Sequence, residues 1–357
     1  MRKVLLRFVF DNLWQWQAVG NELHVGAAWL MLLWVAIVGV AFGVMYATSK
    51  KAAESAMSAG FWLIVPAALA AVWFLKLPIV KTGIPVFGYG MMMFVGFSSA
   101  TWLAGRRVRA IGQPPETIWD MMMWALIPGL IGARIIYLFQ NWDHVFAKKQ
   151  GMHLLLAPFA LWDGGIVFYG SVIGGIAGVA VYCKRRDINA LAMLDVIAPS
   201  MFVGEGFGRI GCFLYGCCYG RACDLPWAVR FPPDSLTFEK LAPEGRIIKN
   251  PLSTIPLHPT QLYSSFAAFA LAGILAWYFR RRPFDGAVLA LGCILYPINR
   301  FILESLRDDE PTRWGTPFTF SQLISIGLLI FGIGAMYCFS TRGKLTGVSR
   351  LNSRASQ

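Results

Sequence analysis

The chain has 357 residues, of which 57% are hydrophobic and only 14% are charged, and its mean hydropathy is +0.55. Soluble domains carry about 25% charged residues, so this composition excludes an ordinary soluble protein and indicates an integral membrane protein. The formal net charge of +13 does not indicate a nucleic-acid-binding protein, because the basic residues lie in short clusters between apolar runs. That arrangement is typical of the positive-inside rule.

Residues 1–20 alternate aromatic and polar positions, which predicts a segment that lies along the membrane interface. A membrane-spanning helix needs about 20 apolar residues. Nine stretches of about this length follow, so we expect an all-α polytopic membrane protein with about nine transmembrane helices. These stretches lie near residues 24–48, 60–77, 86–105, 117–139, 164–183, 191–214, 261–279, 286–305 and 318–340.

Basic residues cluster in alternate connections between the predicted spans. Because Lys and Arg accumulate on the cytoplasmic side, we expect these connections and the C-terminus in the cytoplasm. With nine spans, the N-terminus then lies outside. The clusters are Lys50 and Lys51; Arg106, Arg107 and Arg109; Lys184 to Arg186; Arg280 to Arg282; and the tail from Arg342 to Arg354.

Composition divides the chain into three parts. Residues 1–80 form an N-terminal extension with two transmembrane helices, and residues 341–357 form a basic cytoplasmic tail. Residues 81–340 form the membrane core with the seven other predicted helices. Within this core, residues 218–258 are polar and rich in proline, which predicts a small outside-facing head of turns and short strands.

The stretch from Gly204 to Arg221, GEGFGRIGCFLYGCCYGR, combines charge with glycine at the end of an apolar run. A charged side chain at bilayer depth costs roughly 2.5–3.5 kcal/mol on insertion scales and is rarely kept without a role. Glycines break the helix and let a ligand approach the backbone closely. An arginine beside such a break indicates an anion-binding site, and the abundant anion in a membrane is a phospholipid phosphate.

Further arginines lie near the span ends that we expect outside. Arg134, Arg209 and Arg300 come from three different helices at the same expected level. Glu304 and Arg307 follow Arg300 at i+4 and i+7, on one helical face. We therefore expect the arginines to converge on one anion.

Structural roles compete with this interpretation. Glu205 with Arg209, and Arg300 with Glu304, are i, i+4 pairs that would neutralise each other on one helix. The arginines outnumber the nearby acids, which favours the anion site. A loop hydrogen bond or an interface belt of aromatic residues is the corresponding structural alternative for His258, Tyr89 and Tyr169.

Four of the seven cysteines, Cys212, Cys217, Cys218 and Cys223, lie close together in the sequence. On the outer side of the membrane a disulfide is the natural expectation, with packing as the alternative. No second ligand set with metal-site spacing accompanies these cysteines, so we expect no metal. A catalytic thiol is the weakest of these interpretations.

Several motifs follow one another between Pro85 and Ser340. They are Gly88-Tyr89-Gly90, GARIIY at 132–137, WDGG at 162–165 followed by Tyr169-Gly170, DVIAP at 195–199, GRIG at 208–211 with Gly220-Arg221 downstream, PWAVRFP at 226–232, HPTQLY at 258–263, and Arg300, Glu304 and Arg307. In joint order and spacing they resemble the prolipoprotein diacylglyceryl transferase family of bacterial cytoplasmic membranes.

The resemblance implies a seven-helix membrane core that transfers a diacylglyceryl group from phosphatidylglycerol to the lipobox cysteine of a prolipoprotein signal peptide, as the first step of lipoprotein maturation. It implies a multi-pass protein of the bacterial inner membrane whose active site faces the periplasm. The expected partners are these two substrates and membrane lipids, with no nucleic acid. No metal or other cofactor is implied.

By this resemblance, Arg209 and Arg300 hold and neutralise the lipid phosphate, Glu304 orients Arg300, and Tyr169 is the candidate for thiol activation. These four are the catalytic candidates. Besides Arg209, the substrate-binding candidates are Tyr89, Arg134, Asp163, Gly170, Gly220, His258 and Arg307.

The chain also departs from the family pattern. Cys212, Tyr215 and Cys217 interrupt the signature that follows Gly208-Arg209. Tyr169 stands where many members have a histidine, and Ser264 stands where a glutamate is common. Two alternatives therefore remain open: a divergent homologue acting on another acceptor or headgroup, and a non-catalytic phospholipid-binding membrane protein.

Overall fold

The computed structural model describes residues 4–9, 14, 16–19, 22–48, 84–140, 168–249, 252–308 and 318–342. The predicted second span near 60–77, Asp163 and residues 343–357 of the predicted tail lie outside these ranges. The chain forms two compact units. The first consists of Met1–Phe94 and Gly208–Leu262, and the second of Val95–Phe207 and Tyr263–Gln357.

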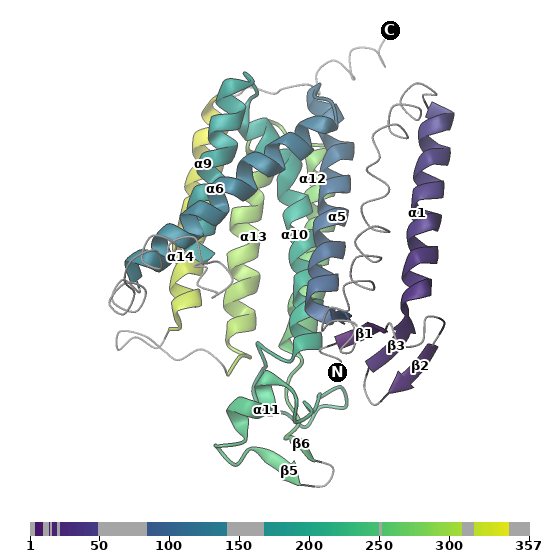
Figure 1. The fold of residues 1–357 in the computed structure, drawn as a ribbon. Coiled ribbons are helices and arrows are strands. Elements are labelled where there is room, and N and C mark those ends of the chain that lie inside the picture. Colours follow the sequence, from purple (N-terminus) through teal and green to yellow (C-terminus); the bar gives the residue numbers. More distant parts are fainter. Residues whose placement is uncertain are drawn as a thin grey trace, which may run out of the picture. The chain divides into compact units, whose positions relative to one another are not determined.

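Eight long helices occur in the described residues, each at the position of a predicted span (Figure 1). Five of them, α6, α10, α12, α13 and α14, are long and apolar enough to cross a membrane by length and composition. The chain is therefore a mostly helical, multi-pass membrane protein, and the predicted total of nine spans is not confirmed. The helices are α1 (Ala27–Thr48), α5 (Gly88–Val108), α6 (Glu116–Gln140), α9 (Phe168–Arg185), α10 (Ala190–Tyr215), α12 (Thr260–Phe279), α13 (Ala287–Glu304) and α14 (Phe320–Arg342), with a 3-10 turn η2 (Arg109–Ile111) after α5.

A four-stranded sheet in the first unit corrects the all-α expectation. Its strands, in the spatial order β2-β3-β1-β4, are β2 (Trp16–Val19), β3 (Glu22–Gly26), β1 (Val4–Val9) and β4 (Ile84–Phe87). Strand β1 runs parallel to β3 and antiparallel to β4. Leu6 on β1 is therefore paired with Leu23 on β3 and with Val86 on β4. The segment interpreted as interfacial thus has β structure, because its backbone groups find partners in a segment far along the chain.

Charge supports this sheet as well. Arg7 Nε lies 2.8 Å from Glu22 Oε2, across from β1 to β3. The hydrogen bond from Arg7 is the main cause that lowers the pKa of the Glu22 carboxyl from its ordinary value. The pair therefore favours the ionised carboxylate and adds to the pairing of the N-terminal strand with its neighbour.

The head contains a small core of its own, made by the buried side chains of Tyr219, Phe231, Leu241 and Leu257. Around it lie the short helix α11 (Leu236–Leu241) and the hairpin of β5 (Ile247–Lys249) and β6 (Leu252–Thr254), as Figure 1 shows. Ser235 caps α11 by accepting a hydrogen bond from Phe238 N, at 3.1 Å. The predicted turns and short strands are present, together with a helix that the sequence argument did not include.

Helices α6 and α9 pack backbone against backbone. Gly170, Gly174 and Gly178 recur every fourth residue on α9, and a Cβ atom at any of them would collide with the α6 backbone. The carbonyl oxygens in the way belong to Gly132, Pro128 and Trp124, respectively. Small residues at this spacing are typical of close helix packing in membranes. Gly170, a predicted substrate-binding residue, thus has a packing role in the fold.

A buried carboxylate on α10 fixes the start of α13. The fully buried Asp195 accepts hydrogen bonds from the backbone N–H groups of Gly286, at 2.8 Å, and Leu289, at 2.9 Å. Arg282 Nε lies 3.6 Å from the same carboxylate. The helix dipole and the guanidinium both stabilise a negative charge at this place. Arg282, counted above among the cytoplasmic basic residues, is therefore a buried partner of Asp195.

We expect the substitution Asp195→Ala to lower the free energy of unfolding by roughly 3–5 kcal/mol, because it removes one buried partner of Arg282 and the common acceptor of two backbone N–H groups. Equilibrium unfolding in detergent measures this change. Asp120→Ala is the matched control, since Asp120 is 55% exposed and pairs with Arg186 at 3.6 Å on the surface. An exposed pair contributes about 0–1 kcal/mol, so equal losses in the two variants would contradict the assigned role of Asp195.

Candidate functional site

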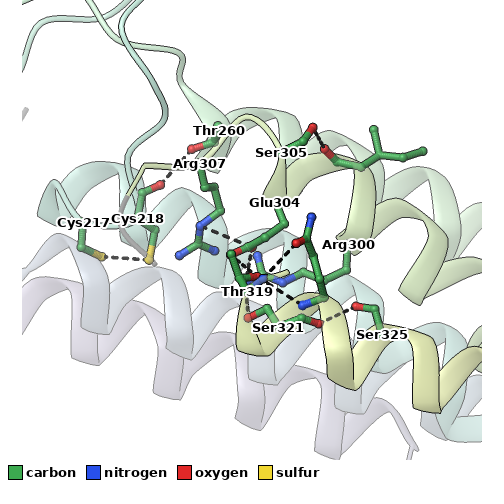
Figure 2. Close-up of polar contacts among 12 residues, drawn as sticks. Cys217, Cys218, Thr260, Arg300, Glu304, Ser305, Arg307, Thr319, Ser321 and Ser325 are labelled. Atoms are coloured by element: carbon green, nitrogen blue, oxygen red, sulfur yellow. Dashed lines mark hydrogen bonds and ion pairs between the residues drawn. The ribbon is translucent and has the colours of Figure 1, made fainter. Parts of the chain in front are cut away.

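Two arginines share one buried carboxylate at the end of α13. Arg300 Nη2 lies 2.9 Å from Glu304 Oε2, and Arg307 Nε lies 3.8 Å from the same oxygen. The side chain of Glu304 is fully buried, and those of Arg300 and Arg307 are 13% and 7% exposed. Figure 2 shows both guanidinium groups directed at this carboxylate. The spacing in the sequence predicted this contact.

The first turn of α14 completes the arrangement with neutral groups. Thr319 Oγ1 donates to the other oxygen of Glu304, at 3.3 Å, and Arg300 Nη2 donates to Ser321 Oγ, at 3.0 Å (Figure 2). Ser321 is held within its helix, where its carbonyl oxygen accepts from Ser325 Oγ at 2.8 Å. These hydroxyl groups fix the side chains without adding a second negative charge.

The charge balance of this cluster separates the two interpretations of the sequence. A single Arg300–Glu304 pair would be neutral, as the structural alternative proposes. Arg307 adds a second guanidinium to the same carboxylate. Within the described part of the chain, Glu304 thus contacts two guanidinium groups. Guanidinium groups stay charged and bind phosphate through a planar fork of donors, so the cluster is suited to hold an anion.

Arg134 lies in the same unit, on α6. It is 8% exposed, and its guanidinium carbon lies 5.1 Å from the centre of the Tyr137 ring, one turn further along the helix. Such a cation–π contact stabilises the charged form of a buried arginine. Tyr169 lies in the first turn of α9, and its side chain is outside the part that the structure describes.

Arg209 and Tyr89 lie in the first unit. Arg209 is half-buried in the last part of α10. Tyr89, in the first turn of α5, packs against α10, where a Cβ atom at Gly211 would lie 3.1 Å from its ring. Its ring centre lies 6.2 Å from that of Tyr215. The predicted convergence of Arg209 with Arg300 joins residues of the two units and stays a prediction.

Gly220 and His258 join the head to the start of α12. Gly220 N donates to His258 O at 3.2 Å, and His258 N donates to Arg221 O at 3.0 Å. A Cβ atom at Gly220 would lie 2.7 Å from both His258 Cβ and Thr260 Cγ2, so only glycine fits without a shift. The structure therefore gives both residues a role in shaping the head, which is the loop alternative stated for His258.

Thr319 and Ser321 are site residues that the sequence did not predict. Both stand in the polar run before the apolar part of α14, and that run was the available signal. Hydroxyl residues are common near helix starts, where they cap; Thr319 Oγ1 also accepts from Gln322 N, at 3.3 Å. Their contacts with Glu304 and Arg300 depend on how α13 packs against α14. A local sequence pattern carries no information about this packing.

Comparison with known proteins gives a consistent family. A family model described as "Prolipoprotein diacylglyceryl transferase" matches residues 78–338. Phosphatidylglycerol–prolipoprotein diacylglyceryl transferase of Clostridium tetani is 36% identical over 251 residues, covering 70% of this chain and 92% of the relative. A second protein with this activity in its name, from Clostridium perfringens, is 35% identical over 70% of this chain and 90% of its own length. The correspondingly named protein of Aeromonas hydrophila is 31% identical over 73% of this chain and 89% of its own.

We expect Glu304→Gln to destabilise the protein by roughly 3–5 kcal/mol, because two buried guanidinium groups lose their common anion. Equilibrium unfolding in detergent measures the loss. Ser305→Ala, an exposed neighbour whose hydroxyl bonds only its own helix at 2.7 Å, is the control and is expected to change little. High phosphate concentration is expected to restore part of the stability of Glu304→Gln, and chloride at equal ionic strength is not. If Glu304→Gln has the same unfolding midpoint as the wild-type protein, the carboxylate does not hold the arginines.

Proposed function

Because this chain belongs to the prolipoprotein diacylglyceryl transferase family, we propose that it transfers a diacylglyceryl group from phosphatidylglycerol to the lipobox cysteine of prolipoproteins. The product is a thioether, and glycerol 1-phosphate leaves. One observation carries the proposal beyond the family match: two buried arginines share a single carboxylate at the end of α13. The names of the relatives do not favour another headgroup or a non-catalytic lipid-binding role.

The chemistry of this transfer requires charge stabilisation on phosphate. The thiolate of the acceptor attacks a glycerol carbon, the carbon–oxygen bond to the phosphate breaks, and its electron pair stays on the phosphate oxygen. The negative charge of the thiolate thus moves to the leaving group. Groups placed where charge develops commonly contribute most to catalysis. Arginine serves this purpose because its planar fork of donors matches two phosphate oxygens.

In this proposal, Arg300 and Arg209 bind the phosphate and neutralise the charge that develops on it. Glu304 orients Arg300, with which it makes a 2.9 Å contact. Arg307 and Arg134 add positive charge at the rim of the proposed phosphate site. The assignment of Arg209 rests on its place in the glycine-rich signature.

The remaining assignments are proposed from the family pattern. Tyr89 binds the headgroup, and Tyr169 is the candidate that helps the acceptor thiol to ionise. An unperturbed thiol has a pKa near 8.5, so such help is needed near neutral pH. Asp163, Gly170, Gly220 and His258 keep their proposed place among the substrate-binding residues, with the packing roles described above for Gly170, Gly220 and His258.

An apolar groove supports the binding of a lipid chain. It has a volume of about 310 Å³ and is lined by residues of α5, α6 and α9, including Phe97, Leu126 and Leu130. Gly129 and Gly175 leave room for it where the helices approach. A groove of this kind, on helices that face lipid, fits an acyl chain that enters sideways from the bilayer.

We further propose a location in the bacterial inner membrane with the head and the reactive groups on the periplasmic side. The basic clusters between spans set this orientation. Residues 1–80 are then an addition to the catalytic core at 81–340, and residues 341–357 are a cytoplasmic tail.

A reporter enzyme that is active only in the periplasm tests the orientation. Fused near Gly245 in the head, it is expected to be active, and fused after Arg282 it is expected to be silent, because the basic cluster at 280–282 stays inside. Activity assays on cells that express equal amounts of each fusion measure this. The reverse pattern would place the head in the cytoplasm and remove the proposed site from the periplasm.

The arginine assignment is tested by substitution with lysine, which keeps the charge and loses the fork. We expect Arg300→Lys and Arg209→Lys each to reduce turnover by about 10²–10³, as loss of one stabilising donor does. The measurement is the mass shift of a lipobox peptide supplied with phosphatidylglycerol, with folding checked separately.

Arg246→Lys is the matched control, since Arg246 lies in the head and pairs with the exposed Glu244 at 3.4 Å. Near-normal turnover in Arg300→Lys and Arg209→Lys would show that these arginines are structural. A wild-type protein that binds phosphatidylglycerol but never shifts the peptide would favour the non-catalytic alternative. A shift only with another headgroup or acceptor would favour the divergent homologue.

A further inference from the structure

Three thiols meet where α10 ends and the head begins. The sulfur atoms of Cys212, Cys217 and Cys218 all lie within 4.8 Å of one another. Cys212 stands in the last turn of α10, and the other two follow in the turn beyond it. None of the seven cysteines of the chain is disulfide-bonded in the structure, so the expected disulfide is not formed.

The turn that carries these thiols is held rigidly. Gly216 has a φ of +75°, and a Cβ atom there would lie 2.7 Å from Ser235 Cβ. Thr237 Oγ1 donates to Gly216 O at 2.9 Å. The next two carbonyl oxygens are also occupied: Gln261 Nε2 donates to Cys217 O at 2.6 Å, and Thr260 Oγ1 donates to Cys218 O at 2.9 Å. Hydrogen bonds to three consecutive carbonyl groups thus fix the backbone of both cysteines before any ligand binds.

The backbone of Cys218 is itself unusual. Its φ is +59°, a left-handed conformation that residues with a Cβ atom rarely adopt. Among the described residues, only Asp187 shares this property without being glycine. Strained backbone is typically kept where it positions a functional group. Here it places the Cys218 sulfur 3.8 Å from that of Cys217.

The spacing of the sulfurs matches one metal ion. A tetrahedral centre with metal–sulfur bonds of about 2.3 Å holds its sulfurs about 3.8 Å apart. A disulfide, with about 2.05 Å between two sulfurs, would use two of the thiols and exclude the third. A bound cation would stabilise three neighbouring thiolates.

We infer that Cys212, Cys217 and Cys218 form a site for a soft, thiophilic metal ion, with Zn²⁺ as the best match, and that its fourth coordination position is open to an external thiol. Among the described residues, no fourth His, Cys, Asp or Glu joins this group. Structural zinc sites have four protein ligands, whereas three ligands with an open position are typical of reactive ones.

The preference for a thiol as the fourth ligand rests on the proposed function, in which the acceptor is a cysteine thiol. A thiol that coordinates the metal loses its proton to solvent and binds as a thiolate. The metal would thereby supply the ionisation of the acceptor thiol for which Tyr169 is the other candidate. This site differs from the arginine cluster in its ligands, since it binds a cation through sulfur.

Metal binding is measured on the full-length protein in detergent under reducing conditions, without lipid or peptide. We expect one Zn²⁺ per chain, and with Co²⁺ the sulfur-to-metal charge-transfer absorption of a thiolate site. Cys217→Ser and Cys218→Ser are expected to weaken binding by at least about 10²-fold, more than the 10–100-fold typical for loss of an outer-shell partner. Cys223→Ser is the matched control, because Cys223 lies in the same head outside the group of three, and is expected to bind normally.

A second measurement uses the unmodified protein and so does not depend on how the variants fold. Bound Zn²⁺ is expected to slow alkylation of Cys212, Cys217 and Cys218, read by mass spectrometry, while Cys223 and Cys338 react as before. Absence of stoichiometric Zn²⁺, equal protection of all five cysteines, or a disulfide within the group in the presence of Zn²⁺ would overturn the site.

The open position is tested on the Co²⁺-loaded protein. A lipobox peptide with cysteine is expected to increase the charge-transfer absorption, and the same peptide with serine is not. No change with the cysteine peptide, while Co²⁺ stays bound, would overturn the open position. Lipid transfer is scored separately, so a protein that binds metal and thiol but transfers no lipid would contradict the proposed function and leave the metal site standing.

Discussion

Helix α13 is held at both ends by a buried carboxylate, and the arrangement of the second unit depends on this. At its start, Asp195 accepts the free backbone N–H groups of the helix and faces Arg282. At its end, Glu304 pairs with Arg300 and Arg307. A buried acid without cations would be costly, so each carboxylate fixes the guanidinium groups around it. The bonds from Thr319 to Glu304 and from Arg300 to Ser321 join this end of the helix to the start of α14, so Arg300 is held beside that helix.

The second carboxylate also shows how stability and reactivity are combined in this transferase. Removing Glu304 would leave the two guanidinium groups without their common carboxylate. The neighbouring hydroxyl groups add hydrogen bonds without adding charge: Thr319 donates to Glu304, and Ser321 accepts from Arg300. The two guanidinium groups held in this way are the groups that we propose to bind phosphate. In that proposal, rigid positioning and anion binding come from the same few side chains.

The sequence predicted those features that repeat along a helix or form an ordered series of motifs. The apolar runs located the observed helices, and the spacing of Arg300, Glu304 and Arg307 predicted their contact. Features that depend on packing between distant segments could not be predicted in this way. Strand β1 pairs with β4 far along the chain, and Arg282, one of a basic run, is buried against Asp195. The three thiols meet because the turn after α10 brings Cys217 and Cys218 close to Cys212, and no spacing pattern in the sequence shows this.

The pairing of β1 with β4 has a consequence for biogenesis. Strand β1 ends at Val9, whereas its antiparallel partner begins at Ile84, so the ribosome adds the intervening chain before the sheet can close. At about 5–20 residues per second, β1 waits for several seconds with one edge unpaired. An unpaired strand edge is a template for association with other chains. The sheet can therefore close only after the start of the family region, which begins at residue 78, has been synthesised.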